Sequence, residues 1–492
     1  MYDFIKHYEN PNKFNEDIIK NFRVEDDMVE YLVDICKAQA NSLPGVTFDG
    51  YEVEHDESKI KAINSVSGKV PITNSRVSLV TFFFTIKFKD EVEKIVMPIL
   101  YPKLIDNYYF ILNGNKYYAI YQNVDVATYN TRASVILKSL LMPIIIKSEI
   151  FSTTDMDGND HNIRIYQLNL FKKRNNFLMY FFPEFGFQGT LEFFGYDKAI
   201  KIVSAETYDK KKNNINEIVF QINKQAYLIA SRKRFETDDL FKSIVGCLLS
   251  LLSKKIQIGK IYDQEYWKIK LGQTFTTNSN AQVTKAESVV LSFRRILDDR
   301  TRKNLRIPDE CKTDVFVLVK WMLENFEDLL RMDNLSLNNK RMRLAEYQCN
   351  GFNRRISTNA YRVLNKKTLT MQAIKSAFRI PANIIISDLQ TSDLMRYSNA
   401  VNDMDVFGVA TKYSNRGPAS MGESAGKTIS NMYRAIHISH LGRLSLNSCS
   451  ASDPGMSGNI SPFIKTDRLY YNTSEITANA FDIDDEELDD LD

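Results

Sequence analysis

The sequence predicts a multidomain α+β protein. Its 492 residues exceed the length that one hydrophobic core usually organises. Hydrophobic residues make up 44% and aromatic residues 12% of the chain, which excludes a mostly disordered protein. The hydrophobic pattern also changes along the chain, from strand-like stretches to helical spacing after about residue 238. We therefore expect β-rich units followed by a mainly helical part.

Short β-strands are predicted between residues 78 and 236. The stretch 78–147 contains VSLVTFFFTIKF, EKIVMPIL and YYFILNGNKYYAIYQ, which are rich in β-branched and aromatic residues. We expect the last of these to fold back at Asn113 and Gly114, because this dipeptide tolerates the positive φ of a tight hairpin. Residues 148–236 continue with HNIRIYQLNLF, NFLMYFF, GTLEFFG and EIVFQINK, which turn-forming residues separate.

Helices are predicted at 238–253, 285–299 and 312–331, where apolar residues recur with helical spacing. Further along, this periodicity weakens and Gly, Ser, Asn and Asp dominate. We therefore expect loops and short elements from 383 to 470, and long ordered loops are usually functional. The acidic tail at 471–492 is expected to be a disordered end or an interaction segment.

Charge is distributed unevenly along the chain. The formal net charge is +3, but the last eleven residues, DIDDEELDDLD, carry eight acids and no base. Removing those eight negative charges leaves +11 on residues 1–481. Between Lys340 and Lys367, eight bases accompany the single acid Glu346, which suits contact with phosphates. The same pattern also fits a solvated helix face or an interface with another chain.

The cysteines and the apolar runs predict a soluble protein of a reducing compartment. Five cysteines lie far apart without a C-x-x-C pair, so neither a disulfide framework nor a thiolate zinc site is indicated. The N-terminus lacks the basic-then-apolar order of a signal peptide. The best apolar run, SIVGCLLSLLS, is too short to span a bilayer.

GESAGKT at 422–428 offers two enzyme motifs. It contains G-x-S-x-G and comes close to a P-loop, whose glycines cradle phosphate before Lys-Thr. A P-loop requires glycine at position 421, where Met421 stands, and either motif should follow a buried strand, whereas KYSNRGPAS precedes this one. A stand-alone P-loop-like or serine hydrolase is therefore an alternative hypothesis, and a non-catalytic DNA-binding takeover protein is another.

Two stretches resemble metal sites but depart from the required pattern. DMDGNDH at 155–161 resembles a calcium loop, yet its glycine is misplaced and Tyr166 stands where a bidentate Glu is needed, so a hairpin turn is predicted. His437, His440 and Cys449 lack a fourth ligand at suitable spacing. We therefore predict no metal site on this chain, and no local cluster supplies the groups of a self-contained enzyme.

Four ordered stretches resemble signature segments of the β subunit of multisubunit DNA-directed RNA polymerases. MPIL at 97–100 and YYFILNGNKYYAIYQ at 108–122 are similar to a Met-Pro-Leu turn and the Asn-Gly hairpin that follows it. DNLSLNNKRMRLAEY at 333–347 resembles the family's acidic segment that ends in Arg-Arg-Ile-Arg. The matching positions are Phe110, Ile111, Asn113, Gly114, Gln122, Asp333, Asn339, Lys340, Arg341 and Arg343.

The other two stretches follow in the family's order. TLTMQAIKSAF at 368–378 and RGPAS at 416–420 are similar to a helix and a Gly-Pro turn of the antibiotic-pocket region. RAIHISHLGRLSLNS at 434–448 resembles the segment His-Pro-Thr-His-Tyr-Gly-Arg, with Arg434, His437, His440, Gly442 and Arg443 in step. The divergence and the Lys, Asn, Ile and Tyr bias resemble the N-terminal half of a split β subunit from a giant bacteriophage, of the non-virion type.

The resemblance implies the family's β-subunit-like fold, with a protrusion, a lobe and a fork. The protrusion is expected in two segments that flank the inserted lobe. The implied domains are a first protrusion segment at 1–147, a lobe at 148–310, a second protrusion segment at 311–382, a fork with active-centre-proximal loops at 383–470 and the acidic tail at 471–492.

The sequence departs from the family in two places. SASDPGMSGNI is an imperfect counterpart of the loop Glu-Thr-Pro-Glu-Gly-Pro-Asn-Ile-Gly. Positions of the family's rifamycin pocket hold Arg396, Asn399, Val409 and Lys412 in place of Gln, Asp, His and Arg. We therefore expect the assembled enzyme to be resistant to rifamycins.

The resemblance implies a nucleotidyltransferase subunit that is not catalytic alone, because the family holds its Mg²⁺ on aspartates of the β′ subunit. The implied partners are the C-terminal half of β, β′-like subunits, a promoter-specificity subunit, the DNA template and the nascent RNA, in the cytoplasm of the infected bacterium. The residues implied to lie near the active centre are Arg434, His437, His440, Arg443 and Asn459. Those implied to bind nucleic acid are Lys340, Arg341, Arg343, Lys412, Arg416 and Lys427. For Arg443, a functional contact and a bracing role both stay open.

Overall fold

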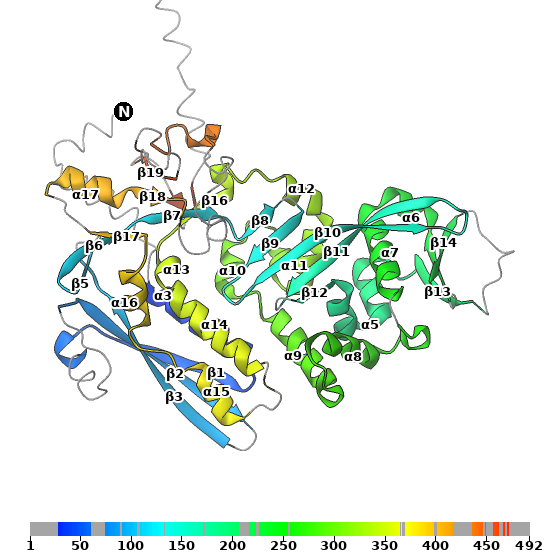
Figure 1. Ribbon diagram of the computed structural model, residues 1–492, viewed down its shortest axis with the longest axis horizontal. Coiled ribbons are helices and arrows are strands. Elements are labelled where there is room, and N and C mark those ends of the chain that lie inside the picture. The colour runs from blue at the N-terminus through cyan, green and yellow to red at the C-terminus, as the bar shows by residue number, and fades with distance from the viewer. Residues whose placement is uncertain are drawn as a thin grey trace, which may run out of the picture. The chain divides into compact units, whose positions relative to one another are not determined.

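The chain folds into two compact units, and the computed structural model shows the predicted α+β class (Figure 1). Unit 1 combines Met1–Val126 with Asp333–Asp492, and unit 2 is Ala127–Met332. The structure describes residues 28–471 except for 61–73, 89–90, 106–108, 132, 171–172, 206–215, 223–225, 254–255, 365, 367–369, 398–400, 417–434, 446–447, 449–455, 462–465 and 468–469. In this described part, no helix is both long and apolar enough to cross a bilayer.

Unit 2 is inserted within unit 1, but its limits differ from the expected lobe at 148–310. The reason is strand pairing, since residues 127–147 supply two strands to the sheet of unit 2. That antiparallel sheet has the order β12-β11-β10-β9-β8, with β8 (Thr128–Thr131), β9 (Ser134–Lys138), β10 (Pro143–Thr154), β11 (Asp160–Leu170) and β12 (Lys173–Asn176). Val315 and Phe326, which lie after residue 310, are also buried in the core of unit 2. The names protrusion and lobe stay predictions.

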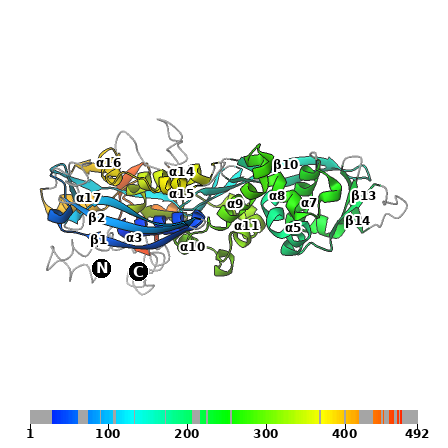
Figure 2. The same ribbon diagram turned by 90° about the horizontal axis from the view of Figure 1, so that it is seen from below.

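A long antiparallel sheet and a layer of helices form one part of unit 1 (Figures 1 and 2). The strands are β1 (Val46–Glu54), β2 (Val77–Phe88) and β3 (Glu91–Pro102), and the helices include α3 (Met28–Ser42), α14 (Asn350–Leu364), α15 (Met371–Ala377) and α16 (Ile384–Gln390). Alternate residues of β2, such as Phe82 and Phe84, are fully buried because one face of the sheet is covered. The ring of Phe84 lies 4.4 Å from that of Phe378, so the two segments of unit 1 share one core.

Two smaller sheets of unit 1 carry parts of the family-like stretches. The first has the order β17-β6-β5-β4, with β4 (Leu104–Ile105), β5 (Tyr109–Leu112), β6 (Asn115–Ala119) and β17 (Met395–Tyr397). Asn113 and Gly114 connect β5 to β6 with φ of 50° and 78°, which confirms the predicted hairpin. The second, here called the motif sheet, has the order β19-β18-β7-β16-β21-β20, with β7 (Tyr121–Asp125), β16 (Lys340–Arg343), β18 (Lys412–Ser414), β19 (Ser457–Asn459), β20 (Thr466–Asp467) and β21 (Tyr470–Tyr471).

Short elements lie along the chain near the strands of the motif sheet, and those described between 383 and 470 agree with the short elements predicted there. They are the 3₁₀ turns η5 (Leu337–Asn339) and η7 (Ile438–His440) and the helices α13 (Ala345–Gln348) and α17 (Asp403–Ala410). Asn402 caps α17, because its side-chain oxygen accepts the Asp405 N–H at 2.9 Å.

Helices dominate unit 2 from residue 178 onward. They are α5 (Leu178–Phe194), α6 (Arg232–Thr237), α7 (Asp239–Leu252), α8 (Gln264–Phe275), α9 (Gln282–Arg294), α10 (Asp299–Asn304), α11 (Val315–Glu324) and α12 (Phe326–Arg331), beside a sheet of β13 (Ile200–Ser204), β15 (Ala226–Ser231) and β14 (Glu217–Ile222). The helix predicted at 238–253 is confirmed as α7, which Asp238 caps. The stretch predicted at 312–331 is helical too, but it is divided at Asn325 into α11 and α12.

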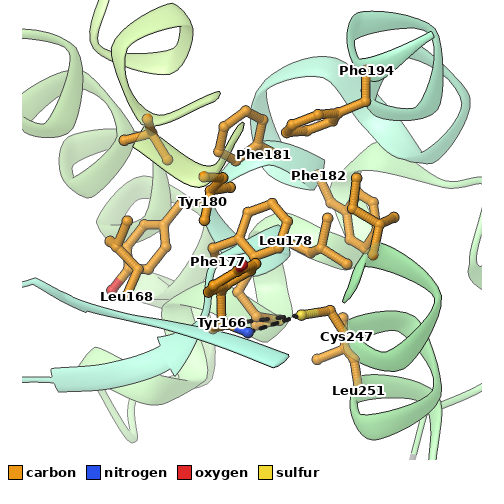
Figure 3. Close-up of a cluster of buried hydrophobic side chains, with 14 of the residues drawn as sticks. Tyr166, Leu168, Phe177, Leu178, Tyr180, Phe181, Phe182, Phe194, Cys247 and Leu251 are labelled. Carbon is orange, nitrogen blue, oxygen red and sulfur yellow. Dashed lines mark hydrogen bonds between the residues drawn. The ribbon is translucent and has the colours of Figure 1, made fainter. Parts of the chain in front are cut away.

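The strands predicted for NFLMYFF and GTLEFFG are wrong, because almost all of both stretches lies in α5. Within α5, Gly186 has φ of 72°, a value that interrupts the helical backbone. Phe181 and Phe182 are fully buried, and Figure 3 shows them among aromatic neighbours in the core of unit 2. A helix that is buried on most sides lacks an amphipathic pattern, so its aromatic run imitates a strand.

Cys247 joins α7 to the sheet of unit 2 (Figure 3). Its Sγ accepts a hydrogen bond from the Tyr166 N–H at 3.3 Å. Its carbonyl oxygen accepts one from Nδ2 of Asn176 at 2.8 Å. Burial raises the pKa of the thiol to about 12, although the hydrogen bond with Tyr166 lowers it. The thiol is therefore protonated at neutral pH and serves packing.

The stretch DMDGNDH is a hairpin turn between β10 and β11 and not a calcium loop. Both carboxylate oxygens of Asp155 are occupied within the turn. Oδ1 accepts the Asn159 N–H at 2.8 Å, and Oδ2 lies 3.0 Å from Nε2 of His161. Burial would raise the pKa of Asp155, but the hydrogen bonds from His161 and Asn159 outweigh it and lower the pKa to about 2.

We expect Asp155→Asn to destabilise unit 2 by about 2 kcal/mol at pH 6, because the lowered pKa makes the folded state favour the carboxylate. A depressed pKa contributes stability above the unfolded-state value near 4, and this contribution is lost as the pH falls toward 2. Urea denaturation at pH 6 and pH 3 should therefore show a difference between wild type and variant that shrinks by about half at the lower pH. A difference that stays constant would contradict the assignment.

Candidate nucleic-acid interface

Gln122 holds three of the family-like stretches together in the motif sheet. It lies on β7, at the end of the hairpin stretch, and is fully buried. Its Oε1 accepts Nε of Arg343 at 2.6 Å, and its Nε2 donates to the carbonyl of Arg416 at 2.9 Å. The next residue, Asn123, donates to the side chain of Asn415 at 2.9 Å. Stretches more than 200 residues apart in sequence therefore meet at one side chain.

The basic strand β16 is internally paired. Arg341 forms a bidentate ion pair with Glu346, with N–O distances of 2.6 and 2.7 Å, and only 9% of each side chain is exposed. Arg343 is 4% exposed and lies 3.9 Å from the same carboxylate. Lys340 pairs with Asp125 at 2.6 Å. Carboxylates of the chain thus pair with all three cations, and their implied phosphate contacts stay a prediction.

Residues 437–443, here called the histidine turn, are fastened to the loop that precedes β16. His437 Nδ1 accepts the Ser439 N–H at 3.1 Å, and its Nε2 lies 3.4 Å from Asp333 Oδ2. Ser439 Oγ accepts the Leu337 N–H at 3.0 Å. These contacts join the histidine turn, in the fourth family-like stretch, to Asp333 and Leu337 of the second.

His440 is held as a neutral ring. Burial lowers its pKa, and the nearby His437 and Lys340 lower it further, whereas the hydrogen bond to the Leu335 carbonyl and the charge of Asp333 raise it. Nε2 lies 2.9 Å from that carbonyl and so carries the proton, while Nδ1 faces the His437 N–H at 3.4 Å. Both ring nitrogens therefore serve structure, and neither is placed as a proton donor to a substrate.

Arg443 and Asn459 brace the same region. Arg443 is 6% exposed and donates from Nη1 to the Ser439 carbonyl at 3.0 Å, and burial lowers its pKa. Asn459 donates from Nδ2 to the Gly408 carbonyl and to Thr411 Oγ1, each at 2.9 Å. For Arg443 the geometry favours the bracing role over direct contact with nucleic acid.

The remaining site residues fall into two groups. Lys412 is half-buried at the start of β18, and Arg416 is exposed two residues after that strand ends. Lys427, Arg434 and the whole GESAGKT stretch lie outside the described residues. Their implied roles stay predictions.

The sequence reasoning missed the acids and amides that assemble the site. Glu346 was visible as the single acid of the basic stretch, five positions after Arg341, a spacing that allows an ion pair. Asp125 gave no comparable signal, because its partner Lys340 is 215 residues away. Within the described residues, no three His, Cys, Asp or Glu side chains group closely enough to hold a metal ion.

The ordered stretches and their convergence in the motif sheet point to an RNA polymerase subunit as the class of this protein. The model of a family described as non-virion RNA polymerase subunit matches residues 2–484, nearly the whole chain. The chain therefore belongs to the non-virion RNA polymerase subunits and is a subunit of a phage RNA polymerase. A search of the curated proteins gives no match.

Proposed function

We propose that the chain is the N-terminal part of the β subunit of a phage DNA-dependent RNA polymerase, which transcribes viral genes by template-directed nucleotidyl transfer. The observation that supports this most is the junction at Gln122, where the hairpin stretch bonds with Arg343 of the second stretch and Arg416 of the third. The junction supports the proposal because it joins three stretches that the resemblance assigns to one β-like scaffold.

The proposed role is positional. The motif sheet and the histidine turn form a rigid fork beside the active centre, and Lys412, Arg416 and Lys427 follow the downstream DNA and the separated strand. The carboxylates nearest the fork's cations, Asp125 and Glu346, are engaged in ion pairs and do not fit a magnesium site. We therefore assign the catalytic Mg²⁺, which supplies Lewis-acid stabilisation of phosphoryl transfer, to a β′-like subunit.

The proposed partners follow from this role. They are the C-terminal half of β, β′-like subunits, a promoter-specificity subunit, template DNA and nascent RNA, all in the cytoplasm of the infected bacterium. Resistance to rifamycins stays a prediction, with Arg396 exposed on β17 and Asn399 outside the described residues.

Affinity purification of the tagged chain from infected cells tests the proposal. Recovery with a second β-like chain and large β′-like chains, together with DNA-dependent RNA synthesis, is the expected result. Recovery as a lone protein would contradict the β assignment. ATP turnover by the purified chain alone would instead favour the hydrolase alternative at GESAGKT.

In the reconstituted polymerase, we expect Arg443→Ala to slow elongation about tenfold while the complex still assembles. The loss would arise because the histidine turn loses the hydrogen bond from Nη1 to the Ser439 carbonyl and shifts. Arg443→Lys should recover part of the rate, since an ammonium can still donate to a carbonyl. Single-nucleotide elongation kinetics measure both, and an unchanged rate in the alanine variant would remove the positioning role.

A further inference from the structure

The basic stretch from Lys340 to Lys366 divides into two groups with opposite environments. On β16 the cations are buried against Asp125 and Glu346. On α14 and just beyond it the cations are exposed, and these are Arg354, Arg355, Arg362 and Lys366. Carboxylates of the chain pair with the cations of β16, so the excess positive charge of the stretch lies on the exposed cations of α14 and Lys366.

The exposed cations share one face of α14. At about 100° per residue, Arg354, Arg355, Thr358, Tyr361 and Arg362 fall within about a third of the helix circumference. The opposite side is buried and packs on α3, α15 and α16 through Phe352, Ile356, Ala360 and Val363. The helix therefore cannot turn its arginines inward, and it presents them on a fixed support.

Negative charge is scarce on this face. The sequence of α14, NGFNRRISTNAYRVL, contains no acid. Among the described residues, no carboxylate forms an ion pair with these arginines. The half-buried Asp388 interacts with Arg354, and burial raises the pKa of this carboxyl although the charge of Arg354 acts to lower it. Solvent-exposed arginines that form no ion pair with a carboxylate favour an anionic ligand.

We propose that the exposed face of α14 binds the phosphate backbone of nucleic acid. Arg354 and Arg362 are separated by about 12 Å along the helix axis, which spans about three to four phosphates of one strand. Guanidinium groups bind phosphate oxygens through two parallel hydrogen bonds, and the Thr358 hydroxyl can add another. Neither this surface nor its residues belong to the fork contacts proposed above.

A nucleic acid fits this face better than a protein partner. Protein interfaces are built around buried apolar or aromatic anchors and are depleted of charge at their centre. On the described face of α14, Tyr361, at 38% exposure, is the one large apolar side chain that is exposed, and arginines surround it. An aromatic ring among arginines is also a stacking position for a single-stranded base.

The test compares two triple variants of the full-length chain that lose the same charge. One is Arg354→Gln, Arg355→Gln and Arg362→Gln, and glutamine keeps the helix propensity of α14. The matched control is Lys201→Gln, Lys233→Gln and Lys303→Gln, three exposed lysines of unit 2. Fluorescence anisotropy then measures the binding of a labelled DNA single strand, an RNA single strand and a DNA duplex between 50 and 300 mM salt, a range over which the Debye length falls about 2.4-fold.

The α14 triple should raise Kd at least about tenfold and reduce the slope of log K against log salt by about 2 on single strands and about 3 on duplex. The control triple should change both quantities much less. Lysine at the three α14 positions should restore the slope, because the charge returns. Tighter binding of RNA, single-stranded DNA or duplex identifies which backbone the surface takes.

Two outcomes would overturn the proposal. One is equal weakening by both triples, which would show a response to net charge alone. The other is poly-glutamate binding as tightly as DNA of equal charge and being lost with the α14 triple, which would make the face a docking site for an acidic protein. The inference does not need the β assignment, since binding by the chain is measured apart from assembly and transcription.

Discussion

Glu346→Gln is expected to destabilise unit 1 by about 3–5 kcal/mol, because it leaves the buried Arg341 and Arg343 without their carboxylate. Glutamine keeps the shape of the side chain, so the loss reports charge and not a cavity. Breaking one partner of a buried pair costs far more than the pair contributes in net terms, since the remaining charge stays desolvated. Urea denaturation at neutral pH, read together with amide hydrogen exchange across β16 and β7, measures the effect.

Glu52→Gln provides the matched control in the same unit. Glu52 is exposed on β1 and should change the free energy of unfolding by less than about 0.5 kcal/mol. A change as small for Glu346→Gln would show that β16 does not depend on the pair. Faster exchange confined to β16 and β7 would instead locate the loss at the junction with Gln122, whose Oε1 accepts from Arg343.

Local features of the fold could be predicted from the sequence because their causes are local. The hairpin at Asn113 and Gly114 follows from two residues that tolerate positive φ. The helix α7 follows from apolar spacing and from Asp238, whose side chain accepts the Phe241 N–H at 3.0 Å. The order of the family-like stretches was likewise readable, and the family match supports their interpretation as a polymerase subunit.

The rest depended on contacts between distant residues. The strands predicted within α5 are wrong because the core of unit 2 surrounds most of this helix, and its polar residues are too few to give an amphipathic pattern. The contacts of Lys340 and Arg343 on β16 could not be predicted, because their partners Asp125 and Gln122 lie more than 200 residues earlier in the chain. The sequence gives the net charge of a stretch, but burial decides which of its charges can reach a ligand. In the stretch from Lys340 to Lys366, the exposed arginines are those of α14.

Gly272→Ala is expected to destabilise unit 2 by about 3 kcal/mol. Gly272 lies on α8, where an added Cβ would stand 2.1 Å from the carbonyl oxygen of Gln282, the first residue of α9. The contact is with backbone, so no side-chain rotation can relieve it and the two helices must separate. The gain in helix propensity from alanine, about 1 kcal/mol, offsets only part of this cost.

Alanine at two other glycines allows the stability losses to be ranked by the kind of atom that the new methyl group meets. At Gly246 on α7 the added Cβ would meet Cγ2 of Ile163 at 2.5 Å, and a side chain can move at lower cost than backbone. At Gly259 the added Cβ would meet nothing within 4 Å. Denaturation of the three alanine variants should therefore give losses of unfolding free energy in the order Gly272, Gly246, Gly259, with the last near zero.

Because residues 127–332 have their own core, hydrogen exchange should show the loss within unit 2 and leave β1, β2 and β3 unchanged. Equal losses at Gly272 and Gly259 would mean that the α8–α9 crossing relaxes freely, and a loss shared by both units would mean that they unfold as one.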